Sequence, residues 1–289
     1  KRVGLNALIE ASGVTLQKIN SSNVAFAIAP RINATGRVFH PEKAIELLLC
    51  EDVTRASELA DVLCGFNAKR RELETEILNQ ALDKLQNDDK SLSAPVIVVG
   101  GENWHHGVIG IVAAKLCGRF CRPCIVMSED GGMIHGSARS YKGVNIFEIL
   151  KGAQEHLAAF GGHELAAGVS ILPEIYDIAI EHIQDSAIEQ FKYLPFSKLD
   201  IALKLNPAAL SIDTVKVTNA LEPFGACNES PVYALTHMQI DKITPVGKTQ
   251  NHIRLDLSRE GTKMQAMCFF TSPDEFYFSV GDTVDLAVE

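Results

Sequence analysis

Residues 96–127 read VIVVGGENWHHGVIGIVAAKLCGRFCRPCIVM, and this stretch decides the fold class. The apolar run at 96–99 is typical of a buried strand, and a loop is expected over 100–106. Apolar positions recur at helical spacing over 108–120, and residues 124–127 again resemble a strand. A strand, a helix and a second strand in this order indicate a layered α/β domain.

The same alternation continues downstream, where Asn145 is placed to cap a helix. We expect a turn at 129–132, a strand at 133–140 and a helix at 145–160. A strand at 168–172 and a helix that starts at a proline, at 173–191, are expected to follow. We therefore assign residues 93–192 to a single α/β domain.

Upstream, residues 41–92 are predicted to form connecting helices. Apolar side chains recur there along one helical stripe, at Leu73, Ile77, Leu78, Ala81, Leu82 and Leu85. This pattern predicts a long helix that bridges two lobes, with the basic cluster at 69–71 on its solvated face. Residues 1–40 are expected to be the C-terminal end of a further domain. Because the first residue is not Met, we expect a piece of a longer protein.

After residue 193 the pattern changes to alternating apolar and polar residues. Half-buried strands produce this pattern, and they are expected at 200–205, 232–243, 252–257, 263–270 and 280–288. A turn is expected at 259–261 between two of them. Several short strands in one segment predict a small β-barrel of the oligonucleotide-binding (OB) type over residues 193–289.

The 289 residues carry a formal net charge of −9 and suffice for two or three structural units. Divided at residues 92 and 192, the segments have 12 basic against 13 acidic residues, 7 against 11, and 8 against 12. No segment is basic overall, so contact with a polyanion is expected from a local groove rather than from the field of the whole molecule. No apolar run has the length of a membrane span, and we expect no membrane association.

Seven scattered cysteines, an odd number, indicate a reducing, cytoplasmic setting. Cys117, Cys121 and Cys124 have a spacing that iron–sulfur clusters use. These three residues fall on an expected helix end, a loop and a strand start, whereas the ligands of a cluster usually share one exposed loop. We favour structural cysteines and keep the cluster as an alternative.

Two motifs suit a phosphate group: GSARS at 136–140 and FGGHELAAG at 160–168. Hydroxyl groups and a planar guanidinium supply short donors, and paired glycines let backbone N–H groups approach a ligand. The candidate residues are Ser137, Arg139, Ser140, Gly161, Gly162 and His163. The alternative is that the two glycines form only a helix C-cap and a turn. Phosphate or nucleotide contact is the favoured interpretation.

Two further segments carry candidate ligand contacts. His105 and His106 precede an apolar helix, whose N-terminus favours anions. They could instead be a helix cap and an exposed ring or, with weaker support, metal ligands. Arg31, Asn33 and Arg37 alternate with small residues after a proline, a pattern that suits phosphate or sugar oxygens.

Several catalytic motifs are missing from the sequence, among them Asp-x-Asp, Asp-His-His, a P-loop, a Gly-x-Ser-x-Gly elbow and a dinucleotide fingerprint. Metal-dependent phosphoryl hydrolysis needs clustered carboxylates and imidazoles. The sequence therefore predicts substrate contacts without a catalytic metal centre, and we assign no metal ligand.

Five separated motifs, in this order along the chain, resemble those of RecJ-type single-stranded-DNA exonucleases in the DHH/DHHA1 phosphoesterase superfamily. They are IAPRINATGR at 28–37, WHHGVIGIVA at 104–113, GSARS at 136–140, FGGHELAAG at 160–168 and LEPFGACN at 221–228. The resemblance covers essentially the whole chain. It implies an α/β DHHA1 domain joined by a long helix to a remnant of the DHH domain, followed by an OB-like β-barrel.

The resemblance implies a 5′→3′ exonuclease of DNA repair and recombination, with single-stranded DNA as its partner and Mn²⁺ or Mg²⁺ in the full-length enzyme. The matching motifs imply that Ser137 and Arg139 contact the 5′ phosphate. They imply that Gly161, Gly162 and the catalytic His163 face the scissile phosphate. Arg31, Asn33 and Arg37 would line the catalytic side of the cleft. The metal-binding DHH domain is not in this sequence beyond residues 1–40. We therefore expect this chain alone to bind nucleic acid, to hold no metal and not to cleave.

Three alternatives stay open. A nanoRNase or cyclic-dinucleotide phosphodiesterase of the same superfamily usually lacks the β-rich tail with the 221–228 motif. A pure binding module, as in the DHHA1 domains of alanyl-tRNA synthetases, would not carry the segment at 31–37. An iron–sulfur enzyme would be coloured when pure.

Overall fold

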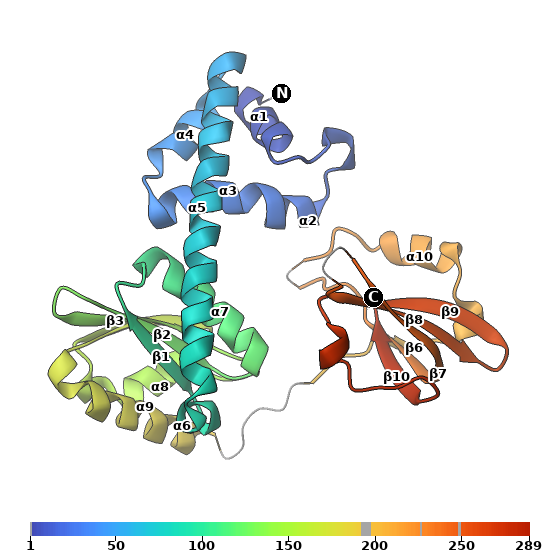
Figure 1. Ribbon diagram of the computed structural model, residues 1–289. Helices are drawn as coiled ribbons and strands as arrows, with labels where there is room; N and C mark the ends of the chain where they lie inside the picture. Colours follow the sequence, from blue (N-terminus) through green and yellow to red (C-terminus); the bar gives the residue numbers. More distant parts are fainter. Residues whose placement is uncertain (1, 192–197, 226, 248–249) are drawn as a thin grey trace. The chain divides into compact units, whose positions relative to one another are not determined.

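The computed structural model describes residues 2–191, 198–225, 227–247 and 250–289 (Figure 1). The chain divides into two compact units, Lys1–Ser197 and Lys198–Glu289. Three clusters of buried apolar side chains lie in the first unit and one lies in the second. No helix in the described ranges combines the length and apolar character that crossing a membrane requires.

The first unit begins with helices packed around the N-terminal half of the 34-residue helix α5 (Val53–Gln86) (Figure 1). Asp52 caps α5 by accepting a hydrogen bond from the backbone N–H of Arg55 at 2.6 Å. The other elements of this layer are α1 (Val3–Ala11), η1 (Leu16–Lys18), α2 (Ser21–Asn23), the π-helix η2 (Val24–Ile28), α3 (Ala29–Val38) and α4 (Glu42–Leu49). The predicted long helix is confirmed.

The C-terminal half of α5 packs against α7 (His106–Phe120), and the short α6 (Asp89–Ser93) follows it. All six members of the predicted apolar stripe join the core shared by α5 and α7. Glu74 of α5 is buried, accepts from Nη1 of Arg70 at 2.6 Å and also pairs with Lys115 of α7. Apolar packing and a buried ion pair thus join the two helices.

Five strands form a mixed sheet in the order β1-β2-β3-β5-β4. They are β1 (Ile97–Glu102), β2 (Cys124–Asp130), β3 (Met133–Arg139), β4 (Ala159–His163) and β5 (Ala166–Ile171). β1 and β2 are parallel and connected through α7, whereas the other neighbours are antiparallel. Gly131 and Gly132, with φ of 59° and 79°, make the tight turn from β2 into β3. The predicted layered α/β domain is confirmed.

One helix of this domain is shorter than the sequence pattern predicts. α8 (Ile146–Gly152) begins at the predicted cap, Asn145, but ends well before residue 160. A 3₁₀ turn, η3 (Gln154–His156), follows, and then β4 begins. Phe160 lies in β4, pairs with Val169 and packs against the core between the sheet and α8. Pairing with β5 thus outweighs the low strand propensity of Gly161 and Gly162.

Helices cover the two faces of the sheet unequally. η4 (Pro173–Ile175) leads into α9 (Tyr176–Gln190), and α8 and α9 pack on the apolar side chains of one face. On the other face α5 and α7 cover β1 and β2, where Val99 and Val126 are buried. β4 and β5 stay open on this second face, because Ala159, Gly161 and Gly168 are exposed. The open half of the sheet makes room for a ligand.

The second unit is a β domain whose strands pair in the order β10-β7-β8-β9, with β6 beside β7. The strands are β6 (Leu203–Lys204), β7 (Tyr233–Val246), β8 (His252–Arg259), β9 (Thr262–Cys268) and β10 (Thr283–Val288), and the short helices are η5 (Pro207–Ala209), α10 (Ile212–Asn219) and η6 (Pro273–Glu275). The predicted turn lies at Glu260 and Gly261, both with positive φ. Among the described residues the sheet stays open rather than closing into the predicted barrel, while its strand content fits an OB-like domain.

Candidate phosphate-binding groove

Three cross-strand rows on the open face of the first sheet define the site. The register aligns Arg139 with Ala166 and His163, then Ser137 with Gly168 and Gly161, then His135 with Ser170 and Ala159. Residues in register on antiparallel strands point to the same face, and so do residues two apart on one strand. The two predicted motifs therefore meet on one surface, with Arg139 and His163 roughly 10 Å apart at their Cα atoms.

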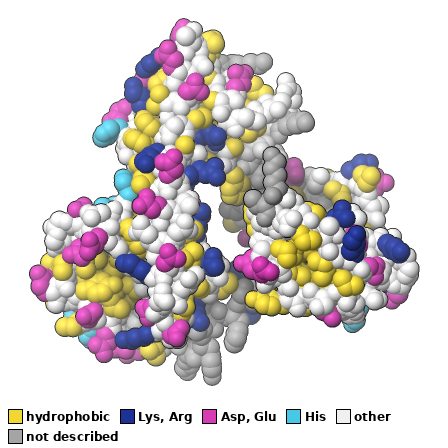
Figure 2. All heavy atoms as spheres, in the orientation of Figure 1, with side chains coloured by type: hydrophobic (Ala, Val, Ile, Leu, Met, Phe, Trp, Pro, Cys, Tyr) yellow, Lys and Arg dark blue, Asp and Glu magenta, His cyan; other side chains and the backbone are white. Residues whose placement is uncertain are grey.

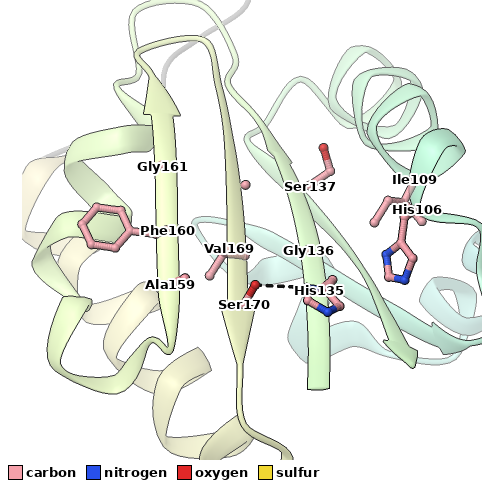
Figure 3. Close-up of a pocket in the computed structure, with 11 residues that line it drawn as sticks. His106, Ile109, His135, Gly136, Ser137, Ala159, Phe160, Gly161, Val169 and Ser170 are labelled. Carbon is pink, nitrogen blue, oxygen red and sulfur yellow. Dashed lines mark hydrogen bonds between the residues drawn. The ribbon is translucent and has the colours of Figure 1, made fainter. Parts of the chain in front are cut away.

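A groove of about 630 Å³ runs along this surface beside α7 (Figure 3). Its wall on the helix side includes His106 and Ile109, and Gly161 and Gly168 lie opposite. The missing side chains at the two glycines keep the groove wide enough for backbone N–H groups to meet a ligand.

Arg139 is half-buried at the end of β3, between the sheet and α7. Its Nη1 donates to Oγ of Ser137 at 3.1 Å and to the carbonyl of Ala138 at 2.8 Å. Burial lowers the pKa of Arg139 below its usual range, and the positive charge of Arg37 lowers it further. Two cations near each other in a partly buried place would be stabilised by a bound anion.

Two glycines of α7 make this arrangement possible. A Cβ at Gly110 would lie 2.8 Å from Nη2 of Arg139 and 2.8 Å from Oγ of Ser137. A Cβ at Gly107 would lie 1.9 Å from the carbonyl oxygen of Arg37 in α3. Residues 107 and 110 are one helical turn apart and share a face. This face therefore lets both arginine-bearing segments approach α7.

The segment of Arg31, Asn33 and Arg37 is the helix α3. Asn33 and Arg37 are exposed and four residues apart, and Arg37 donates to the carbonyl of Gly107 at 3.3 Å. Arg31 points elsewhere, donating to Sγ of Cys64 at 3.1 Å and to the carbonyl of Ala27. Of the two arginines, Arg37 therefore approaches the face of α7 that Arg139 also contacts, and Arg31 does not.

The other predicted residues have distinct surroundings. Ser140 donates its hydroxyl to the carbonyl of Val144 and so closes a loop instead of facing the groove. His105 is the N-cap of α7, and its Nδ1 accepts from the N–H of Gly107 at 3.1 Å. His106 is exposed on the groove wall. His163 is exposed at the end of β4, where its Nδ1 accepts from the N–H of Leu165 at 3.3 Å.

The three cysteines at the spacing of a cluster all make contacts within the fold, and Cys121 donates to the carbonyl of Gly118 at 3.7 Å. Cys117 is buried and donates to the carbonyl of Ser140 at 3.0 Å, and Cys124 is buried and donates to that of Arg122. Burial, with a smaller effect of Cys121, raises the pKa of Cys117 to about 11, and burial also raises the pKa of Cys124. A raised pKa favours the neutral thiol, whereas cluster ligands are thiolates.

The donor groups present do not fit a metal centre. In the part of the chain that the structure describes, no group of three or more His, Cys, Asp or Glu side chains is arranged to hold a metal ion. We therefore derive no step through a metal from the residues of this chain.

Three residues that line or shape the groove were not predicted from the sequence motifs: Gly110, His135 and Ser170. Gly110 lies in a quoted motif, but only the packing of α7 on β3 shows why a side chain is excluded there. His135 and Ser170 lie next to the motifs and carry no signal of their own in the sequence. The pairing of β3 with β5 brings them together.

Comparison with known proteins shows which families this chain is similar to. The family model described as the DHHA1 domain matches residues 90–191, and the one described as the RecJ OB domain matches residues 201–289. The Bacillus subtilis protein named single-stranded-DNA-specific exonuclease RecJ is 31% identical over 273 residues, covering 93% of this chain and 34% of that protein. The Haemophilus influenzae protein of that name is 28% identical, covering 93% and 48%.

A crystal structure of RecJ from Thermus thermophilus in complex with Mg²⁺ has a TM-score of 0.83 to this chain at 28% identity. The match covers 99% of this chain and 43% of that one. A second structure of that protein, with Mn²⁺, has the same TM-score. The chain spans between about a third and a half of the length of the curated relatives cited above.

The fold and the site define the class: a DHHA1 domain with a glycine-floored groove, followed by an OB domain. Within that class, the chain is of the RecJ type.

Proposed function

We propose that this chain is the substrate-binding portion of a metal-dependent 5′→3′ exonuclease that degrades single-stranded DNA in repair and recombination. One observation carries the proposal: Ser137, Arg139, Gly161 and His163 share one open sheet face, and Arg37 and Arg139 both approach the glycine face of α7. The relatives named as single-stranded-DNA-specific exonucleases support the substrate and the reaction.

In this proposal the terminal 5′ phosphate binds between Ser137 and the two guanidinium groups of Arg139 and Arg37. Arg139 is held ready by its bonds to Ser137 and Ala138, so little side-chain freedom is lost on binding. Gly161 and Gly162 let the following phosphodiester approach the backbone of β4. His163 would meet that group through Nε2, because its Nδ1 is bonded to Leu165.

The metal that hydrolysis requires would be held by residues outside this chain. Solved RecJ structures are described with Mg²⁺ and with Mn²⁺, which supports metal dependence of the whole protein. When bound, such an ion would activate water and stabilise charge on the phosphate. We further propose that residues 1–40 end the metal-bearing DHH domain, that 41–92 connect it to the DHHA1 domain at 93–192, and that 193–289 form the OB domain.

The OB domain would hold the single strand, and several exposed aromatic rings support this role. Phe270 and Tyr277 are 84% and 90% exposed. His252 lies edge-on to Phe270 and to Phe269, with ring centroids 5.2 and 5.5 Å apart. Stacking of bases on such rings is tolerant of sequence. The match of residues 201–289 to the RecJ OB domain supports this function over a dinucleotide phosphodiesterase.

The test uses the whole protein and this chain side by side. In the whole protein, Arg139→Ala should slow degradation of 5′-phosphorylated single strands by roughly a hundredfold and that of 5′-hydroxyl strands much less. Equal losses on both ends would contradict a 5′-phosphate pocket. The chain alone should bind the strand without releasing nucleotides in Mn²⁺, and metal-dependent release by the purified chain would contradict the division of roles.

A further inference from the structure

A second cavity, of about 550 Å³, lies where β1 and β2 end, beside the start of α7. It is lined by Leu73, Glu76, Ile77 and Gln80 of α5, by residues 102–106, and by Ser128 and Asp130 of β2. Small-molecule sites commonly have volumes of about 300–1,000 Å³. β1 and β2 are parallel, and α/β folds bind ligands at the carboxyl ends of parallel strands. Of these lining residues, only His106 also lines the phosphate groove.

Ser128 brings a buried hydroxyl without a partner to this cavity. It follows Val126 by two residues on β2, so its side chain leaves the sheet on the face that α5 and α7 cover. The residue is fully buried, and its Oγ has no hydrogen-bond partner in the part of the chain that the structure describes. An unpaired buried hydroxyl lowers stability, and a bond to a ligand atom would remove this penalty. Ser128 therefore points to a ligand.

The charges around the cavity favour a cation. Glu76, Glu102 and Asp130 line it, and all three residues are exposed. None of the described residues that line it is Lys or Arg, and the carboxylate of Asp130 lies 3.5 Å from Nε2 of His106. Three carboxylates would repel an anion such as a nucleotide phosphate and attract a positively charged group.

The walls favour an organic cation over a metal ion. In the described ranges, no group of three or more His, Cys, Asp or Glu side chains is arranged to hold a metal. Leu73, Ile77 and the buried Trp104 give the cavity an apolar wall, which suits a hydrocarbon chain. The ring of Trp104 already has one ammonium group near it, because Nζ of Lys84 lies 5.5 Å from its centroid.

A linear aliphatic diamine carries two ammonium groups on such a chain. Ser128 and Asp130 are two residues apart on β2 and point to the same face, so one ammonium group can donate to both. We propose that this cavity binds a linear aliphatic diamine, with one ammonium group on Ser128 and Asp130 and the other balanced by Glu102 and Glu76. The proposed function uses none of these residues, so the two proposals stand or fall separately.

Calorimetry with this chain and 1,4-diaminobutane, at low ionic strength and without DNA, tests the site. The wild type should bind one diamine per chain, and butylamine, with a single ammonium group, roughly tenfold more weakly. Asp130→Asn and Glu102→Gln should each lower the affinity about fivefold. Glu72→Gln is the matched control, since it removes an exposed carboxylate of α5 outside the cavity and should change nothing. No binding by the wild type, or equal losses in all three variants, would overturn the proposal.

Ser128→Ala separates a ligand contact from a structural role. Because it removes an unpaired polar atom, it should not lower the melting temperature of the free chain, while the affinity for the diamine should fall about tenfold. Unchanged affinity in this variant would contradict the contact with Ser128. Titration with Mg²⁺ alone checks the class of ligand. Mg²⁺ that displaces the diamine at equal concentration, and whose binding is lost in the same variants, would overturn the choice of an organic cation.

Discussion

At the scale of single residues, the site depends on the absence of a side chain at Gly110 of α7. Arg139 lies between a strand and a helix, where an ordinary side chain at position 110 would occupy the place of its guanidinium group. Glycine in a helix interior lowers stability by about 1 kcal/mol relative to alanine. Gly110 therefore lowers the stability of α7 but leaves space for the side chains of Ser137 and Arg139.

Gly110→Ala should push Arg139 and Ser137 out of position, because the new Cβ would lie 2.8 Å from both side chains. We expect affinity for a 5′-phosphorylated strand to fall roughly tenfold, measured by fluorescence anisotropy. The clashing atoms belong to side chains that can move, so the protein should still fold.

Gly118 provides the matched control on the same helix. It is exposed, and a Cβ there would meet nothing within 4 Å. Gly118→Ala should leave binding unchanged and raise the free energy of unfolding by about 0.5–1 kcal/mol. Equal binding by both variants would refute the role of Gly110.

The sequence predicts a phosphate ligand for the site, but only the structure shows which residues share its surface. Hydroxyl, guanidinium and glycine at 136–140 and 160–168 indicate a phosphate ligand. The pairing of β3 with β5, and of β5 with β4, places Ser137 and Arg139 on one face with Gly161 and His163. The local pattern does not show that the hydroxyl of Ser140 donates to the carbonyl of Val144 within a loop. It also could not find His135, because its partner Ser170 is distant in sequence.

At the scale of elements, the β4–β5 hairpin forms the open side of the groove, and its two glycines have different tasks. Gly162 has φ of 151°, and a Cβ there would lie 2.3 Å from the carbonyl oxygen of Ala166. Gly161 meets nothing within 4 Å of an added Cβ and is exposed to the groove. Gly162 is therefore needed for the fold of the hairpin, whereas Gly161 keeps the floor of the groove free of a side chain.

Substituting each glycine by alanine should separate these tasks. Gly162→Ala should cost about 2–3 kcal/mol in the free energy of unfolding. Gly161→Ala should change stability by less than about 0.5 kcal/mol and still weaken strand binding several-fold, since a methyl group would stand on the groove floor. Urea unfolding and a binding titration of both variants test this. Comparable destabilisation by both would show that the distinction is wrong.

The junction of α5 with α7 depends on one buried carboxylate. Glu74 is 6% exposed and serves both Arg70 and Lys115. Glu74→Gln would leave two cations without their counter-charge, and we expect a loss of about 2–4 kcal/mol in the stability of the first unit, measured by urea unfolding. Glu72→Gln, which breaks an exposed pair with Lys69, should cost less than about 1 kcal/mol. Similar losses in both variants would contradict this account.

Element type was predictable wherever the apolar period is long. The stripe along α5 and the strand, helix and strand at β1, α7 and β2 follow from local pattern and appear in the structure. β4 was not predictable in this way, because its five residues include two glycines. It is a strand because β5 provides a partner and the core accepts Phe160.

At the scale of the whole molecule, the charge distribution is not the one expected of a protein that attracts nucleic acid by its overall field. Acidic and basic side chains are interspersed over the face drawn in Figure 2, and the net charge is −9. The first unit nevertheless brings Arg37 and Arg139 together beside an open sheet face. If the chain binds a single strand as proposed, the attraction depends on this local site more than on bulk charge.

We propose above that this local site binds a terminal 5′ phosphate selectively. The most direct measurement is a pair of dissociation constants for one single-stranded oligonucleotide carrying either a 5′-phosphate or a 5′-hydroxyl end, for the wild-type chain and for Arg139→Ala. The wild type should prefer the phosphorylated end at least about tenfold, and the variant should bind both ends alike. Equal affinity of the wild type for the two ends, or a preference that survives in the variant, would contradict it.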